Sequence, residues 1–287
     1  MSGRYAGIDL AAQARHTALA VLRETGGGSD ADSADDDSID ADGPEHESRG
    51  DGAADADSSG GLLLERVVAG AEDSDLLALA PEVRKIGVDV PVGWPRPFVE
   101  LLTAQAAGTL PAPASTGREW RRGLAMRATD LAVHERTGLT PLSVATDRIA
   151  HPALRWAGIE ARLRDQGIDA SRDGSGLICE VYPAAALRAW QLPSRGYKGV
   201  KNAAARRALV DALAAQLPAL DWNGHQDLCA REDDALDAVL AALVAREVDQ
   251  GRAVPPPPHL RELSRQEGWI WVPREVTPRD PGGAGRP

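Results

Sequence analysis

The sequence is poor in cysteine and has no long apolar run. Its two thiols, Cys179 and Cys229, are too few for a disulfide framework or a cysteine zinc site, so a reducing, cytoplasmic location is expected. No stretch of about 18 apolar residues is present, which excludes a transmembrane helix. The first residues lack a signal-peptide profile. We therefore expect no membrane partner.

The chain also lacks an overall basic character, because its formal net charge at pH 7 is −11. That charge is local, since 12 acids and one base, Arg49, lie between Asp30 and Asp57. The rest of the chain is neutral overall, so net charge neither indicates nor excludes a nucleic-acid partner. Residues 26–61 contain almost no large apolar side chains, which predicts a disordered acidic insertion.

Strand and helix patterns follow one another in an order typical of a mixed α/β sheet. Three early strands are predicted at residues 4–10, 16–23 and 62–70, with the acidic insertion between the last two. Later strands at 85–90 and 176–182 alternate with helices, which favours an antiparallel half and a parallel half in one sheet. Helices are predicted at residues 74–81, 97–107, 151–166, 184–190, 203–216 and 231–248.

The last of these helices begins with acids. Its apolar residues recur at the spacing of one helix face: Leu236, Val239, Leu240 and Leu243. Asp234 and Asp237 are three residues apart, so they are neighbours on the helix surface, and Asp233 shares a face with Asp237. One interpretation is that these acids only complement the helix dipole. The other is that they belong to a site.

Acids in the predicted strands favour the second interpretation. Asp9 and Asp89 lie at strand ends, where ligands bind in parallel sheets, and Glu180 lies in the fifth strand. A buried acid is costly unless it is paired or bound to a metal. Four or five carboxylates without a neutralising histidine suit Mg²⁺ or Mn²⁺. Two such ions about 3.5–4 Å apart would activate a water for attack on a phosphodiester.

Six short motifs, in order between residues 4 and 248, make the chain similar to a known family. They are Gly7-Ile8-Asp9, Gly87-Val88-Asp89-Val90-Pro91-Val92-Gly93, Arg127-Ala128-Thr129-Asp130, Glu180-Val181-Tyr182-Pro183, Tyr197-Lys198-Gly199 and Asp233-Asp234-Ala235-Leu236-Asp237-Ala238. The chain resembles the ribonuclease H-like superfamily and, within it, the family of predicted nucleases called DUF429.

The resemblance implies a fold and a set of site residues. The fold would be a five-stranded mixed sheet, three antiparallel strands and then parallel ones, flanked by helices. The superfamily's metal acids fall on Asp9, Asp89 and Asp237, and a second helix acid of its resolvase branch falls on Asp234. Glu180 matches the family's own strand-five motif. The implied activity is metal-dependent cleavage of nucleic acid, with DNA or RNA left open.

Three basic residues are candidates for binding substrate phosphates. Arg127 could instead form an ion pair with Asp130 one helical turn away. Lysines placed as Lys198 and Lys201 are more often part of a solvated loop than phosphate contacts. His16, His134, His151 and His225 have no metal-ligand spacing and are expected to be structural.

For the whole chain we predict a ribonuclease H-like domain over residues 1–250, with a helical insertion at about 96–170. A Pro-rich segment and tail follow at 251–287, in which residues 268–273 form an edge strand or a flap. The predicted function is a divalent-metal-dependent nuclease. The alternative is a non-catalytic module that uses the same fold to bind nucleic acid or protein partners.

Overall fold

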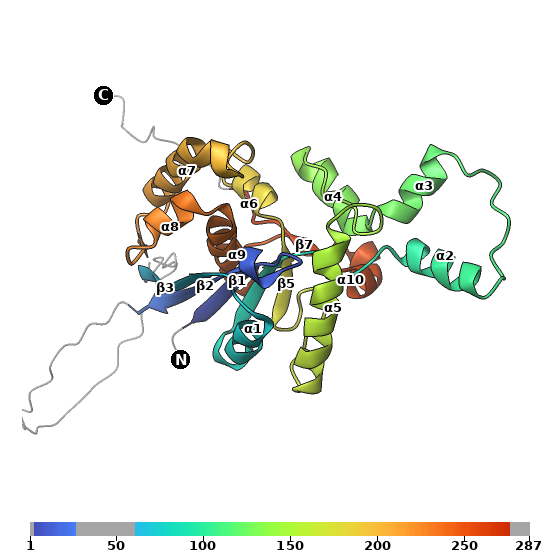
Figure 1. Ribbon diagram of the computed structural model, residues 1–287, viewed down its shortest axis with the longest axis horizontal. Helices are drawn as coiled ribbons and strands as arrows, with labels where there is room; N and C mark the ends of the chain where they lie inside the picture. Colours follow the sequence, from blue (N-terminus) through green and yellow to red (C-terminus); the bar gives the residue numbers. More distant parts are fainter. Residues whose placement is uncertain (1–2, 27–60, 276–287) are drawn as a thin grey trace, which may run out of the picture.

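The computed structural model describes residues 3–26 and 61–275. The predicted disorder of the acidic insertion, residues 26–61, falls almost wholly outside these ranges and stays a prediction. A seven-stranded mixed sheet forms the centre, in the order β6-β3-β2-β1-β4-β5-β7 (Figure 1). Its strands are β1 (Arg4–Asp9), β2 (Ala18–Thr25), β3 (Gly61–Ala69), β4 (Lys85–Asp89), β5 (Ile178–Val181), β6 (Leu220–Asp221) and β7 (Ile270–Trp271).

Helices connect and cover these strands. The α-helices of the described residues are α1 (Asp73–Leu79), α2 (Arg96–Ala106), α3 (Arg118–Ala125), α4 (Ala128–Thr137), α5 (Ala150–Asp165), α6 (Pro183–Ala189), α7 (Ala203–Gln216), α8 (Gln226–Arg231), α9 (Asp233–Asp249) and α10 (Arg261–Glu267). Short 3₁₀ turns lie at η1 (Ala14–His16), η2 (Ala80–Glu82), η3 (Val200–Asn202) and η4 (Pro258–Leu260).

Alternation along the strands divides the core into two layers, one on each face of the sheet. In β1, Tyr5 packs into the core that contains α9, whereas Ala6 and Ile8 pack into the core that contains α1 and α5. Successive side chains of a strand point to opposite faces, which produces this division. Helix α9 is apolar on nearly all sides and is buried from Ala235 to Ala245.

Strand direction decides which ends of the strands meet. β1 pairs antiparallel with β2 and parallel with β4, and β4 pairs parallel with β5. The carboxyl ends of β1, β4 and β5 therefore lie at one edge of the sheet. In open sheets of this kind that edge is where ligands bind.

The mixed sheet flanked by helices agrees with the sequence prediction, but the count of five strands was too low. The two extra strands, β6 and β7, contain two residues each, too few to show a period of two. Of the two forms predicted for residues 268–273, the edge strand is the one present, because β7 pairs parallel with β5. Helices α8 and α10 were not predicted.

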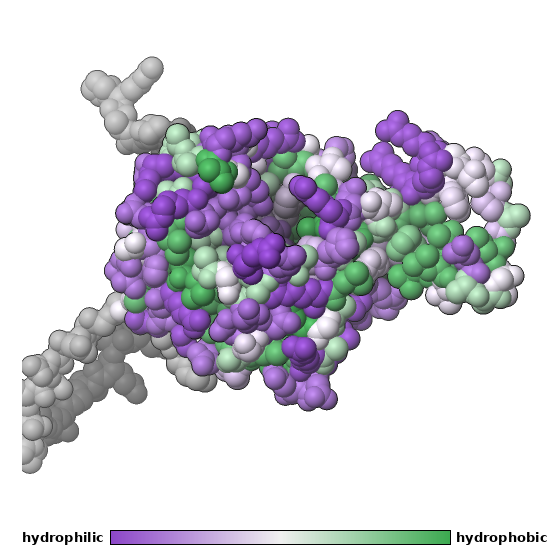
Figure 2. Space-filling view, in the orientation of Figure 1, coloured by the Kyte–Doolittle hydropathy of each residue, from purple (hydrophilic) through white to green (hydrophobic). Residues whose placement is uncertain are grey.

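Helices α2 and α3 stand away from the sheet as an arm (Figure 1). The space-filling view shows apolar residues over α2 and hydrophilic ones over α3 (Figure 2). Val99 and Leu102 of α2 are 49% and 46% exposed. The arm belongs to the predicted helical insertion, whose last helix, α5, instead packs on the sheet through Trp156 and Ile159.

Candidate functional site

Strand register places two predicted site acids side by side. Residues of β1 and β4 pair as Gly7 with Gly87 and Asp9 with Asp89. Tyr5 faces the α9 core, so Gly7 and Asp9 of the same strand face it too. Both acids end their strands at the same edge of the sheet, on the side covered by α9.

The paired glycines bring α9 directly onto the sheet. A Cβ atom at Gly7 would overlap the backbone of Ala238 and Ala242, and one at Gly87 would overlap the carbonyl oxygen of Ala241. The helix backbone therefore lies against the strand backbone, a contact that any side chain would prevent. Asp237, which precedes Ala238, is thereby held beneath the strand ends and is 0% exposed.

The four acids from these three elements influence one another electrostatically. The pKa of Asp9 is raised well above its usual value by burial and then by the charges of Asp89 and Asp237. Burial also raises the pKa of Asp89, to about 7, with Asp237 adding to the rise and the nearby Lys198 ammonium opposing it. The pKa values of Asp234 and Asp237 are raised as well, in each case first by burial. These acids form one cluster, which we call the acid cluster.

Among the residues that the structure describes, one cation enters the acid cluster. The Lys198 ammonium pairs with Oδ2 of Asp237, and the Tyr197 hydroxyl donates to Oδ1 of the same carboxylate at 2.8 Å. Burial alone would lower the pKa of Lys198, but Asp237 and Asp89 outweigh it and raise that pKa. The Lys198 side chain is 54% exposed, so it reaches the acids from the surface.

A buried arginine holds the loop that carries Lys198. The guanidinium of Arg206 on α7 is 1% exposed and donates to the backbone carbonyls of Tyr197, Gly199, Ala230 and Arg231. The backbone N–H of Gly199 donates to Asp233 at 3.1 Å, which ties the loop to the start of α9. The position of Lys198 is therefore fixed by contacts to main-chain atoms.

Above the acid cluster lies a cleft of about 960 Å³, which we call the acid cleft. Asp9, Asp89, Asp234 and Lys198 line its floor and wall. Its other charged or titratable lining residues can all carry positive charge: Arg15, His16, Arg148 and His151. Lys201 is exposed on η3 and is absent from this lining within the described residues.

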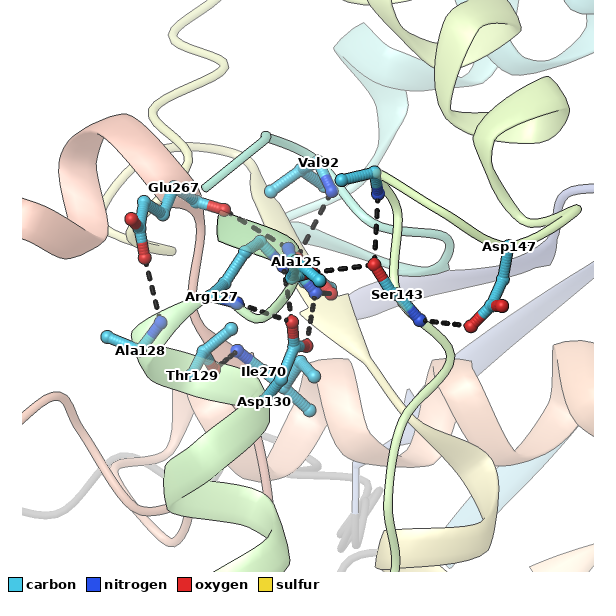
Figure 3. A network of polar contacts seen from close by, with 12 residues as sticks. Val92, Ala125, Arg127, Ala128, Thr129, Asp130, Ser143, Asp147, Glu267 and Ile270 are labelled. Atoms are coloured by element: carbon cyan, nitrogen blue, oxygen red, sulfur yellow. Dashed lines mark hydrogen bonds and ion pairs between the residues drawn. The ribbon is translucent and has the colours of Figure 1, made fainter. Parts of the chain in front are cut away.

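The other predicted phosphate ligand, Arg127, lies in a buried network (Figure 3). Its guanidinium has five N–H donors. Three go to Asp130 and Glu180 through Nε and Nη2, and the two on Nη1 go to Glu180 and the backbone oxygen of Glu267. The side chain is 1% exposed and has no donor left for a phosphate. The ion pair with Asp130 was the correct interpretation of this motif.

Glu180 lies near the acid cluster but is not free to join it. In the sheet register Glu180 pairs with Val88, one residue before Asp89, so the alternation turns it to the other face. Both of its carboxylate oxygens accept from Arg127, and Oε2 also accepts the backbone N–H of Val92 at 3.1 Å. Its prediction as a catalytic acid is not supported by this arrangement.

Sequence reasoning missed several residues of the acid cleft. His16 and His151 were expected to be structural, yet both line the cleft, and Arg15 and Arg148 lie beside them. Tyr197 and Arg206 fix the cluster without belonging to any acid motif. The Tyr197-Lys198-Gly199 motif was the only sequence signal for this part of the site.

The donors of the acid cluster fit a hard divalent cation in type and in charge. All four are carboxylates, and once ionised they carry four negative charges, which one ammonium cannot balance. Within residues 3–26 and 61–275, however, no three carboxylate, imidazole or thiol side chains stand at metal-binding spacing. Lys198 occupies part of the space among the acids. Metal binding would therefore require the side chains of this cluster to rearrange.

Comparison with known proteins gives a family but no named activity. Among the described residues, no helix is long and apolar enough to cross a membrane. No curated protein and no solved structure matches the chain. Residues 7–261, which include every member of the acid cluster, match the family described as "Protein of unknown function (DUF429)". The chain belongs to the DUF429 family.

Proposed function

We propose that this protein is a ribonuclease H-like, divalent-metal-dependent nuclease that hydrolyses phosphodiester bonds in the acid cleft. The observation that carries the proposal is that Asp9, Asp89 and Asp234, from two strand ends and a helix, line one cleft with a cationic rim. The buried Asp237 lies near enough for its charge to raise the pKa of Asp9. The antiparallel β1–β2–β3 half followed by parallel β4 and β5 supports the ribonuclease H-like assignment.

Charge explains why a cation is needed. During cleavage the scissile phosphodiester carries a negative charge beside the acid cluster, and the four carboxylates, once ionised, repel it more than a single ammonium attracts it. Asp9, Asp89, Asp234 and Asp237 would hold Mg²⁺ or Mn²⁺, and such an ion supplies activated water and neutralisation of the leaving oxygen. Arg15 and Arg148 on the rim would orient the phosphates of the strand, since basic side chains position nucleic acid through its backbone.

The test is cleavage of labelled nucleic acids, single-stranded, duplex, hybrid and branched, with Mg²⁺, with Mn²⁺ and with EDTA. We expect cleavage only with metal, and its loss in Asp9→Asn and in Asp237→Asn. These amides remove charged ligands without opening a cavity, so both variants should fold. Asp211→Asn, an exposed acid on α7, is the matched control. Cleavage that persists unchanged in both amide variants would place the active site elsewhere.

A non-catalytic module for nucleic acid or protein partners is the second candidate. The observation that favours it is the pairing of Lys198 with Asp237, which partly neutralises the acids without any metal. Wild-type protein that cleaves no substrate and binds no Mn²⁺ in calorimetric titration would select this candidate.

A further inference from the structure

A second cavity, of about 400 Å³, opens beside the acid cleft, and we call it the side pocket. The two share four residues, Asp89, Leu142, Ile149 and Lys198, so they adjoin at the acid cluster. The walls of the side pocket are mainly apolar and include Val90, Pro91, Pro141, Val181, Pro183 and Ala184. A ligand could therefore span both spaces, with its polar part at the acids and an apolar part in the side pocket.

The floor of the side pocket offers no free hydrogen-bond donor from Arg127, because all five of its N–H groups are used. Free polar groups lie elsewhere in the lining. Tyr182, Ser194 and Arg195 line the pocket, and within the described part of the chain the structure gives none of their side chains a hydrogen-bond or ion-pair partner. Burial raises the pKa of the partly buried Tyr182 hydroxyl, and the charge of Asp89 adds to the rise.

We infer that the side pocket receives one unpaired base of a nucleic-acid strand whose backbone lies in the acid cleft, so that the substrate is single-stranded. The inference rests on the proposed function and narrows its substrate. An apolar pocket lined by aromatic rings, here those of Tyr182 and Tyr197, accepts any base by stacking. Its volume lies at the lower end of ligand pockets, which suits one base with its sugar. Arg195 and Lys198 carry the charge that the adjoining phosphates need.

Duplex geometry explains the preference for a single strand. A paired base is stacked between its neighbours and must leave the helix before it can enter a pocket. That step costs a few kcal/mol in a duplex and much less in a single strand. The pocket therefore selects strands whose bases are already free.

The experiment measures binding without cleavage. Fluorescence anisotropy in EDTA compares a labelled 12-nucleotide single strand, the same strand with abasic sites, and the same strand in a duplex. We expect the intact single strand to bind at least about tenfold more tightly than the other two, because one stacked base contributes about 1–3 kcal/mol. A free mononucleotide is included as a competitor and should compete weakly.

Variants of the pocket test the location. Ala184→Phe fills the pocket, and Tyr182→Ala removes the Tyr182 ring. Both should lower single-strand affinity about tenfold and leave duplex affinity unchanged. Tyr182→Phe keeps the ring and should bind as wild type does. Ala161→Phe, at an exposed position of α5, is the matched control for added size. Circular dichroism checks that each variant folds.

Several results would overturn the inference. These are equal affinity for single strand and duplex, no effect of abasic sites, pocket variants that bind normally, binding of mononucleotide alone, or no binding of nucleic acid. The comparison of intact and abasic strands uses wild-type protein, so it tests the contribution of a base to binding even if a variant misfolds. Because binding is measured in EDTA, it is separate from the proposed function. Metal-dependent cleavage that prefers duplexes would support the proposed nuclease activity and contradict the binding of a base in the side pocket. Single-strand binding without cleavage would support the base-binding pocket and contradict the nuclease activity.

Discussion

Asp89 shows how burial of a single residue links stability to pH. Its pKa, raised to about 7 in the folded protein by burial, lies well above the usual aspartate value of about 3.9. The folded state therefore binds this proton more tightly than the unfolded state does. The resulting stabilisation is complete at pH values below about 4 and is lost as the pH rises towards 7.

Asp89→Asn should remove the loss of folding stability that occurs as the pH rises, because an amide does not ionise. In EDTA we expect the variant to melt at a higher temperature than wild type at pH 8, with little difference at pH 4. A gain of about 1 kcal/mol would raise the melting temperature by about 2–4 °C in a chain of this size. Thermal unfolding followed by circular dichroism measures it, with Asp211→Asn as control. An equal change in melting temperature at both pH values would contradict the raised pKa of Asp89.

Arg127 tests the buried network of Figure 3. Arg127→Met should lower the free energy of unfolding by about 3–5 kcal/mol, because it leaves Asp130 and Glu180 buried without their cation. Arg122→Met, an exposed arginine on α3, should change it by less than about 0.5 kcal/mol. Urea denaturation measures both. A loss below about 1 kcal/mol for Arg127→Met would mean that water replaces the guanidinium.

Single residues also show where sequence reasoning succeeds. Asp9 and Asp89 could be placed together because each follows an alternating apolar strand at its end. Glu180 could not be placed correctly, because the face it occupies depends on the register between β4 and β5. A shift of one residue reverses that face. No local pattern in residues 176–182 fixes the register.

At the scale of elements, the loop that carries Lys198 places an ammonium against Asp237, where it would compete with the proposed metal. Lys198→Met removes the cation that pairs with Asp237 and leaves that carboxylate buried. We expect the variant to be less stable than wild type in EDTA and to recover stability in Mn²⁺, which binds the folded state only. Mn²⁺ should bind about tenfold more tightly, since a competing charge is gone.

Calorimetric titration and thermal unfolding measure these two changes in Lys198→Met. Lys201→Met, three residues along the chain and outside the lining of the acid cleft, is the matched control. An unchanged Mn²⁺ affinity in Lys198→Met would show that the ammonium and the metal do not compete.

The contact between α9 and the sheet depends on glycine. Gly87→Ala should destabilise the protein by about 1–3 kcal/mol or more, because the added methyl group overlaps the backbone of α9. It should also weaken Mn²⁺ binding, since displacement of α9 moves Asp237 away from Asp89. Gly158→Ala is the control: this helical glycine has open space around its Cβ position, so the change should be neutral or stabilising. Normal metal binding by Gly87→Ala would disconnect the helix contact from the site.

The elements themselves were largely predictable. Helix α7, residues 203–216, has the predicted bounds, and β1 and β4 agree within one residue at each end. Long periodic segments carry their own signal. The strands β6 and β7 do not, because two residues pair only where a neighbouring strand already exists. Their formation depends on the rest of the fold.

At the scale of the whole molecule, the end of the described chain completes the sheet and the Arg127 network. Besides β7, Glu267 accepts the backbone N–H of Arg96 at 2.7 Å and that of Ala128 at 2.8 Å. Its own backbone oxygen accepts from Arg127. Residues 251–275 therefore join the insertion to the sheet.

A chain that ends at Gln250 should consequently be far less stable than the full chain. We expect a loss of several kcal/mol and an increase in susceptibility to protease, because the edge of β5 and the network are both exposed. A chain that ends at Glu275 keeps every described contact and is the control. Urea denaturation that gave the same midpoint for both chains would mean that residues 251–275 form an independent unit.

The acid cleft is the feature of the whole molecule that sequence reasoning could not reach. Its floor comes from strand ends and α9, but its rim comes from residues 11–16 and 142–152, which have no pattern in common. Arg155 joins these regions through hydrogen bonds to the backbone oxygen of Ala11 and to Thr17. Such distant contacts leave no periodic signal, so the histidines of the rim could be found only in three dimensions.

Because Arg206 holds the loop, the side chain at position 198 can be changed without a change in the path of the backbone. Its hydrogen bonds reach only main-chain oxygens, so they hold the path of the loop whatever side chain the residue at 198 carries. A glutamate or histidine placed there would be presented to Asp89 and Asp237 by the same backbone. A single substitution at position 198 would thus decide whether the acids are paired with a cation from the chain or are joined by a further side chain able to bind metal.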